Sequence, residues 1–114
     1  MSTETNETIV KRFIEAANAR DAARLNEILT PELAHRWRQS VLPWLHGTFA
    51  GHTMMIKSII GCNDNVVVRI TTSGLHTGEW HGIPATNKPW ANDGVYFMRI
   101  AGGRIGGLEA LFHE

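Results

Sequence analysis

The sequence predicts an α+β domain in which N-terminal helices pack on a strongly curved antiparallel sheet. Apolar residues recur at three-to-four spacing in the first part of the chain, which is typical of amphipathic helices. After Gly51 the composition changes to β-branched and aromatic residues, in four runs separated by turn-forming segments. Helices that precede strands in this order must cover one face of the sheet, so its concave side is the natural place for a cavity.

Two helices open the predicted domain. The first covers Thr5–Ala19, where apolar side chains share one face and charged side chains take the other. Asp21 is suited to accept a hydrogen bond from free N–H groups at the start of a second, shorter helix, which Thr30-Pro31 ends or redirects. The stretch Glu32–Phe49 has roughly helical spacing that Pro43 interrupts, and we expect a short helix there.

Four strands follow and form a predicted meander. They are expected at His52–Ile60, Val66–Gly74, Trp90–Ile100 and Arg104–Phe112, with turns at 61–65, 82–89 and 101–103. In the third strand both alternating sets of side chains are largely apolar, whereas the core of one subunit buries only one set. We therefore predict a homodimer in which a second subunit covers the outer set.

Length and charge limit the functions that the chain can have. Its 114 residues fit one domain, residues 1–114, and 43% hydrophobic with 19% charged residues is ordinary for a globular protein. Eleven basic residues balance eleven acidic ones, which leaves no electrostatic footprint for nucleic acid. No apolar run is long enough to span a membrane, Cys62 has no partner for an internal disulfide, and the polar N-terminus lacks the apolar core of a signal peptide. We expect a cytoplasmic protein without nucleic-acid or membrane partners.

The segment from Val66 to Thr86, VVVRITTSGLHTGEWHGIPAT, carries a distinctive order of motifs. A VVVR strand leads to G-L-H-T-G-E and then to G-I-P-A-T, and further along the chain come F-M-R and, after a short turn, G-R-I. This order resembles the SnoaL-like polyketide cyclases, whose pattern is G-T-H-T-G-E, G-I-P-x-T-G, F-x-R and G-R-I. Asn87 stands where that pattern has the glycine after P-x-T.

This resemblance implies the cone-shaped, barrel-like fold of the nuclear transport factor 2-like superfamily. That fold serves isomerases, dehydratases, epoxide hydrolases, cyclases and non-enzymatic binding proteins, so the fold alone fixes no reaction. Cyclases of the family use an acidic residue as acid and base for an intramolecular aldol closure of a polyketide ester, without metal or organic cofactor. The resemblance therefore implies a cofactor-free enzyme that acts on a small, mostly apolar carbonyl or ester compound.

His76 and Asp93 are the first two candidates for acid/base chemistry. Strand alternation places His76 on the face of the second strand that is otherwise apolar, so it points into the cavity if that face lines it. The alternative is a histidine that only orients the hairpin through its ring nitrogens. Asp93 is the carboxylate of the strand in which the resemblance places the acid/base residue, but it lies on the outer face if Trp90 and Asn92 point inwards.

Glu109 is the third candidate, because it alternates in phase with Ile105 and Leu111. Burial on such an apolar face would raise the pKa of its carboxyl group and prepare it as a base near neutral pH. The alternative is a salt bridge from Glu109 to Arg69 or Arg99 in a neighbouring strand.

The candidate substrate-binding residues are Trp80, Trp90, Asn92 and Tyr96. Together they offer flat apolar walls, an amide and a hydroxyl, which suit a small carbonyl ligand. As ordinary core residues they would have the same sequence pattern.

The sequence gives no indication of a metal site, since its six histidines form neither H-x-H nor H-E-x-x-H and no cysteine pair is present.

Our first hypothesis is a cofactor-free acid/base enzyme that uses His76 with Asp93 or Glu109. The alternative is a non-catalytic domain that binds a small apolar molecule in the same pocket, which the absence of a buried carboxylate would favour. An epoxide hydrolase ranks below both, because it would need an Arg and two Asp residues acting together and no Arg-x-Asp stands on the expected strand.

Overall fold

The chain divides into a helical half and a sheet half, as the sequence predicts. The computed structural model describes residues 3–112, with side chains from residue 5 onwards. The helical elements are α1 (Thr3–Ala19), α2 (Ala22–Ile28), α3 (Pro31–Arg36), the π-helical turn η1 (Trp37–Val41) and α4 (Leu42–Thr48). The strands are β1 (Phe49–Cys62), β2 (Asn65–His76), β3 (Pro89–Ala101) and β4 (Arg104–Phe112). None of the helices in this part of the chain is long and apolar enough to cross a membrane.

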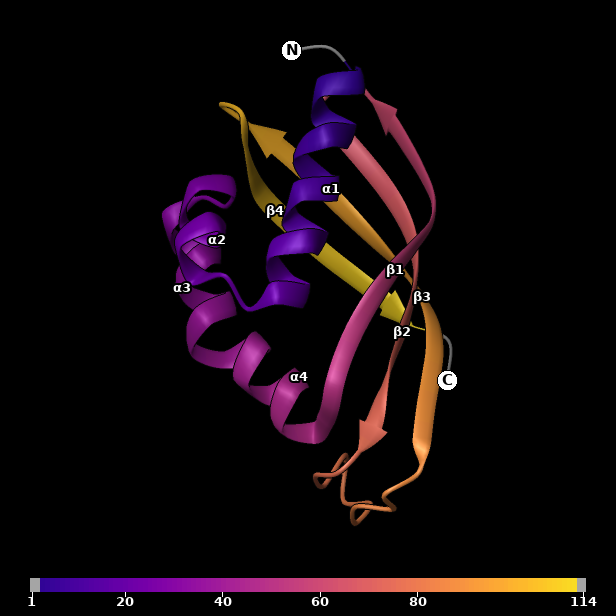
Figure 1. Cartoon of the computed structure of the whole chain (residues 1–114). Helices are drawn as coiled ribbons and strands as arrows, with labels where there is room; N and C mark the ends of the chain where they lie inside the picture. Colours follow the sequence, from indigo (N-terminus) through magenta and orange to yellow (C-terminus); the bar gives the residue numbers. More distant parts are fainter. Residues whose placement is uncertain (1–2, 113–114) are drawn as a thin grey trace.

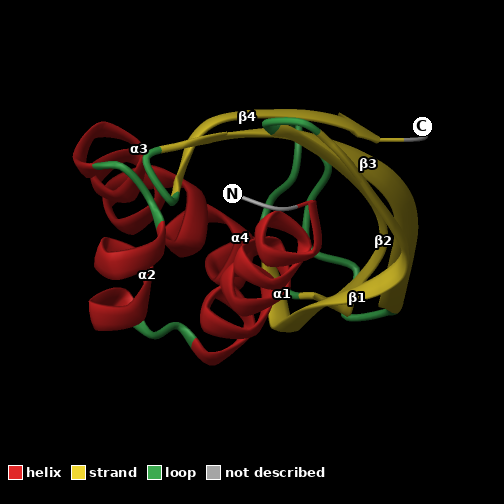
Figure 2. Cartoon of the chain, turned by 90° about the horizontal axis from the view of Figure 1, so that it is seen from above, coloured by secondary structure: helices red, strands yellow, loops and turns green. Residues whose placement is uncertain are grey.

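The four strands form one antiparallel sheet in the order β1-β2-β3-β4, so the predicted meander is confirmed. Seen from above, the sheet curves around α1, and α2 and α3 lie on its open side (Figure 2). Seen from the side, β2 and β3 continue past the end of α1 to a long loop, with α4 beside the start of β1 (Figure 1). The expected α+β cone is confirmed.

Helix α1 fills the curve of the sheet with its apolar face and is fastened at both ends by asparagine side chains. The buried residues of this face are Ile9, Val10, Phe13, Ile14, Ala16 and Ala17. Near its start, the Asn6 amide donates to the Asn63 carbonyl at 2.9 Å. Near its end, the Asn18 amide donates to the Met54 carbonyl at 2.9 Å and its carbonyl accepts from the Met54 N–H at 2.8 Å. Asn18 therefore satisfies both backbone groups of a buried residue on the edge strand.

The ends of the first two helices follow from local backbone chemistry. Helix α1 stops at Arg20, which has a φ of 55°, and the Asp21 N–H bonds the Ala16 carbonyl at 2.9 Å. The Asp21 carboxylate then accepts from the Arg24 N–H at 3.1 Å and caps α2, as predicted. Pro31 stands in the first turn of α3, so the expected redirection at Thr30-Pro31 is confirmed.

The expected short helix within Glu32–Phe49 is wrong in length, because helical structure runs without a break from Pro31 to Thr48. Proline lacks an N–H and its ring crowds the carbonyl four residues earlier, which normally kinks or ends a helix. Here the π-helical turn precedes Pro43, and the Leu42 N–H bonds the Trp37 carbonyl five residues back. The wider turn thus lets the helical chain continue past the proline.

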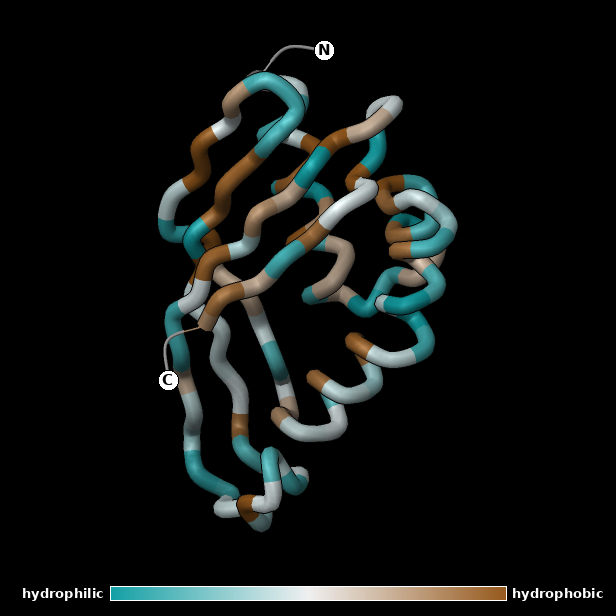
Figure 3. Tube along the Cα trace, turned by 180° about the vertical axis from the view of Figure 1, so that it is seen from behind, coloured by the Kyte–Doolittle hydropathy of each residue, from teal (hydrophilic) through white to brown (hydrophobic). Residues whose placement is uncertain are grey.

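The outer face of the sheet carries exposed apolar side chains. Apolar and polar residues alternate along the strands, as Figure 3 shows in its view of the molecule from behind. The large exposed ones on strands are Met55, Ile60, Val67, Leu75, Phe97 and Leu111. The homodimer that this pattern suggests stays a prediction.

Replacing Asn18 with alanine is expected to lower the free energy of unfolding by about 2 kcal/mol, because Met54 loses both of its backbone partners. Asn26→Ala is the matched control, since Asn26 is an exposed helical residue whose replacement brings the same gain in helix propensity. Urea denaturation of the two variants measures the difference. Equal stabilities would show that the Asn18 bonds contribute nothing.

Candidate functional site

Histidine and aromatic side chains gather at the end of the cone beyond the end of α1. They come from α4, β1, β2, β3 and the loop between β2 and β3, which meet at the lower end of the molecule in Figure 1. We call this group the histidine–aromatic cluster. Its members are His46, Phe49, His52, His76, Trp80 and Trp90.

Phe49 lies at the centre of the cluster. Its ring stacks on Trp90 with centroids 4.1 Å apart and an interplanar angle of 15°. The centroids of His76 and Trp80 both lie 5.7 Å from that of Phe49, and the His52 centroid lies 6.2 Å away. These separations are those of favourable aromatic pairs, so Phe49 joins side chains from three strands and a loop.

Two glycines give the cluster its geometry. Gly74 lies on β2 opposite Trp90, and a Cβ atom there would lie 2.9 Å from the Phe49 Cβ, so the missing side chain allows Phe49 to reach across β2. Gly51 adopts a φ of 67° at a register shift in β1 between Ala50 and Thr53. This bulge changes the phase of the strand and turns His52 to the inside, where it is buried.

His76 ends the inward face of β2 and is buried, as strand alternation predicts. The backbone of the returning loop encloses it: the His76 N–H donates to the Lys88 carbonyl at 3.0 Å, and the His76 carbonyl accepts from the Asn87 N–H at 2.8 Å. Its Nδ1 lies 3.0 Å from the Thr86 Oγ1, whereas its Nε2 is buried and has no hydrogen-bond partner among the residues described. The second ring nitrogen is thus a buried polar atom that none of the described residues satisfies.

The loop that covers the cluster is tightly built. The N–H groups of Thr77 and Gly78 both donate to the Thr48 carbonyl at 3.0 Å, which fixes the start of the loop on α4. At its tip, Trp80 and Ile83 pair through two backbone bonds of 2.8 and 2.9 Å. Asn87 has a φ of 57°, so it adopts the left-handed conformation for which glycine is usual, and which asparagine tolerates better than most residues.

Several polar atoms of the cluster are buried without a partner in the part of the chain that the structure describes. They are both ring nitrogens of His46, Nε2 of His76 and Nε1 of Trp80. The neighbouring turn η1 adds Nε1 of Trp37 and Nε of Arg38. Because unpaired buried polar atoms are costly and rare in native proteins, this concentration marks an interior that suits the polar groups of a small ligand or of water.

Burial keeps two histidines of the cluster neutral. Desolvation, and secondly the nearby His46, lower the pKa of His52 to about 4. Desolvation and the charge of Arg20 also lower the pKa of His46. A hydrogen bond with the Ala17 backbone raises this pKa and partly offsets the decrease. Their rings centre 5.7 Å apart. Near neutral pH this pair therefore adds polarity to the interior without adding charge.

The structure does not bring Asp93 or Glu109 together with His76. Asp93 is exposed on the outer face, where it accepts a hydrogen bond of 2.7 Å from the Thr71 hydroxyl. Glu109 is also exposed and lies opposite Phe97 in the register of β3 and β4. Both residues line an outer groove of about 430 Å³. No carboxylate between residues 5 and 112 is buried.

The expectation that Glu109 shares a buried face with Ile105 is wrong because the register shifts. Arg99 pairs with Gly107 but Ile100 pairs with Ile105, so β4 contains an extra residue between these pairs. Ile105 is buried before this bulge, whereas Glu109 and Leu111 face outwards after it. The alternative salt bridge from Glu109 to Arg69 or Arg99 is not formed within the described chain either.

The four candidate substrate-binding residues all lie on the concave side or in its loop. Trp80 and Trp90 belong to the cluster and are half-buried. Asn92 is also half-buried, next to Thr72 of β2. Tyr96 lies deeper, where its hydroxyl donates to the Met54 Sδ at 3.5 Å and burial raises its pKa. Tyr96 is thus part of the core, and the other three lie nearer the open end.

His46 and His52 were not among the site residues expected from the sequence. The alternation of His52 with Met54 in the expected first strand was a usable signal, since both are buried. His46 offered no such signal, because Pro43 obscured the helical register of its segment.

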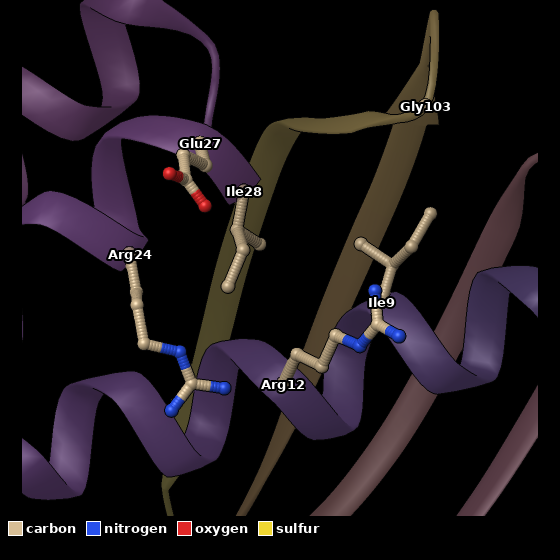
Figure 4. A pocket seen from close by; sticks show the side chains of 6 residues that line it. All are labelled: Ile9, Arg12, Arg24, Glu27, Ile28 and Gly103. Carbon is tan, nitrogen blue, oxygen red and sulfur yellow. The ribbon is translucent and has the colours of Figure 1, made fainter.

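A separate groove of about 270 Å³ lies between α1, α2 and the turn that joins β3 and β4 (Figure 4). It is lined by Ile9, Arg12, Arg24, Glu27, Ile28 and Gly103. None of the expected site residues lies there, and the predicted apolar pocket of the cone stays a prediction. Among the residues described, no three metal-binding side chains come together.

Comparisons with known proteins agree on the fold. A family model described as SnoaL-like polyketide cyclase matches residues 7–109. TsrD from Streptomyces laurentii is 19% identical, covers 98% of this chain and 90% of its own, and superposes with a TM-score of 0.87. IdmH, a putative polyketide cyclase from Streptomyces antibioticus, is 20% identical. The match covers 94% of this chain and 91% of IdmH, with a TM-score of 0.81. AclR, a putative hydroxylase from Streptomyces galilaeus, is 17% identical. The match covers 98% of this chain and 77% of AclR, with a TM-score of 0.82. No curated protein sequence matches the chain.

Acid is expected to destabilise the protein through His52. Its pKa is about 4 in the folded state and 6.5 ordinarily, so the unfolded chain binds the proton first and stability falls as the pH drops from about 6.5 to 4. The whole loss is about 3 kcal/mol, at about 1.4 kcal/mol per pKa unit. Urea denaturation of the wild type and His52→Gln at pH 7 and pH 4 measures it. A shallower pH dependence is expected for His52→Gln, whereas the exposed control His35→Gln should keep the wild-type dependence; identical curves for all three would contradict the assignment.

Proposed function

Since the chain belongs to the SnoaL-like polyketide cyclase family, we propose that it is a cyclase-type enzyme that acts on a small apolar carbonyl or ester compound by proton transfer. The observation that carries this proposal is His76, whose Nε2 is buried and unpartnered while its Nδ1 is held by Thr86. The likeness to IdmH, described as a putative polyketide cyclase, agrees with it.

The cluster supplies the two groups that enolisation of a carbonyl compound requires. The Nε2 lone pair of His76 takes a proton from the carbon next to the carbonyl, and the electron pair of that C–H bond becomes the enolate. The Trp80 Nε1–H, which is buried and lacks a partner, is a donor for the developing oxyanion. In ring closure the enolate carbon attacks a second carbonyl carbon, and the proton on Nε2 passes to the new alkoxide. The imidazole is thereby regenerated, and side chains alone perform the reaction.

The imidazole takes the role that the family resemblance gives to an acidic residue. Asp93 and Glu109, the carboxylates considered from the sequence, both lie on the outer face. An imidazole nitrogen with a free lone pair can take up a proton and return it, as this role requires.

The second candidate function is a non-catalytic domain that binds a small apolar molecule in the same interior. The observation in its favour is that no carboxylate is buried between residues 5 and 112. The stacked pair of Phe49 and Trp90 offers a flat apolar surface for such a ligand.

We expect the protein to catalyse exchange of the proton next to a carbonyl with solvent deuterium in a panel of β-keto esters and cyclic ketones, followed by proton NMR. His76→Gln should lower the exchange rate by about 100-fold or more, because it removes the base. Asp93→Asn and Glu109→Gln should leave the rate within about twofold, and circular dichroism confirms folding of each variant.

Two results would contradict this proposal. Exchange that is unchanged in His76→Gln would exclude the histidine as the base, and loss of exchange in Asp93→Asn or Glu109→Gln would return the role to a carboxylate. Binding of panel members without any exchange would favour the non-catalytic domain.

We also propose that the functional unit is a homodimer joined through the outer sheet face. Besides its exposed apolar residues, this face carries Arg69, Arg99, Asp93 and Glu109, none of which forms a salt bridge within the described chain. A face with apolar area and both signs of charge is self-complementary about a two-fold axis, since the arginines of one copy can meet the carboxylates of the other.

Sedimentation velocity is expected to show a dimer for the wild type. Phe97→Lys should give a monomer, because it places a charge at the centre of the outer face. The control Ile83→Lys changes an equally exposed apolar residue in the loop and should remain dimeric. A monomeric wild type, or a dimeric Phe97→Lys variant, would exclude this interface.

A further inference from the structure

We propose that Thr86 is a positioning residue that holds a proton on Nδ1 of His76 and so leaves the lone pair of Nε2 free to act as the base. This inference rests on the proposed function, because it specifies how His76 is prepared for its role. It assigns a purpose to a threonine of the loop that the acid/base chemistry itself does not use.

Backbone bonds fix Thr86 beside the imidazole. The two residues that follow it, Asn87 and Lys88, form the backbone hydrogen bonds that enclose His76. Asn87 has the left-handed conformation, at a φ of 57°, and turns the chain between Thr86 and Lys88. The 3.0 Å contact between Thr86 Oγ1 and His76 Nδ1 therefore comes from a residue whose backbone is held next to His76 by the loop.

The direction of the hydrogen bond follows from counting donors. A neutral imidazole has one N–H, which lies either on Nδ1, where Thr86 accepts it, or on Nε2, where it would be a buried donor without a partner. Buried N–H groups without an acceptor are rarer in native proteins than acceptors that lack a donor. The first arrangement is therefore favoured.

The Thr86 oxygen is suited to accept in this arrangement. Thr86 is an exposed residue, so its own hydroxyl proton can go to water. The Lys88 N–H approaches the same oxygen at 3.4 Å, a long contact that leaves the second lone pair for Nδ1. When Nε2 takes up a proton, the Nδ1–H bond to Thr86 becomes charge-assisted and stronger, which supports the imidazolium.

The test uses four variants of the full chain and two readouts. Nitrogen-15 NMR of the imidazole rings, with His76 assigned by its absence in His76→Gln, is expected to show protonated Nδ1 and unprotonated Nε2 in the wild type at neutral pH. Thr86→Val, which keeps the shape but lacks the hydroxyl, should give a mixture of tautomers, and Thr86→Ser should restore the wild-type signals.

In the deuterium exchange assay, Thr86→Val should lower kcat about tenfold with little change in KM, as expected for loss of one hydrogen bond to a charged group. Thr86→Ser should recover the rate. Thr77→Val alters a loop threonine whose backbone N–H bonds the Thr48 carbonyl, and it should match the wild type.

Two outcomes would overturn the inference: a proton on Nε2 in the wild type, or a Thr86→Val variant with wild-type tautomer and rate. The tautomer of the wild type is read without substrate and without any substitution of Thr86. It therefore decides the inference even if no exchange activity is found or if Thr86→Val fails to fold.

Discussion

The packing of α1 into the curve of the sheet is the constraint on which the rest of the structure depends. Its apolar face is buried against the concave side, and Asn6 and Asn18 fasten its two ends to the turn after β1 and to β1 itself. The helix ends at Ala19, but β2 and β3 continue past it (Figure 1). The interior beyond that point needs other side chains, and it is filled by the histidine–aromatic cluster. A polar site thus arises where the apolar helix stops.

Small irregularities of the backbone decide which side chains enter this interior. The bulge at Gly51 turns His52 inwards, and the absence of a side chain at Gly74 lets Phe49 stack on Trp90. The bulge in β4 has the opposite effect on Glu109, because it moves that carboxylate to the outer face. The resulting interior holds imidazole and indole groups without a buried carboxylate among residues 5–112, which is why the proposed chemistry falls to His76.

The regular parts of this structure were accessible from the sequence, and its irregular parts were not. The period of two along Val66–His76 is sufficient to place His76 on the buried face, and the capping role of Asp21 follows from its position before a helix. In contrast, the π-helical turn before Pro43 and the bulges of β1 and β4 depend on how neighbouring segments pack. Each bulge changes the phase of a strand by one residue, so Glu109 was expected inside although the bulge in β4 turns it outwards. Catalytic candidates near a bulge are therefore the least predictable residues of such a sheet.

The most direct test of the central claim, that the histidine–aromatic cluster is the functional site, is a crystal structure of the protein soaked with a β-keto ester. We predict that the compound lies on the concave side, with the carbon between its carbonyl groups beside the His76 Nε2 and an oxygen within hydrogen-bonding distance of the Trp80 Nε1. A compound that binds only in the groove between α1 and α2, while the cluster holds neither ligand nor water, would contradict the account.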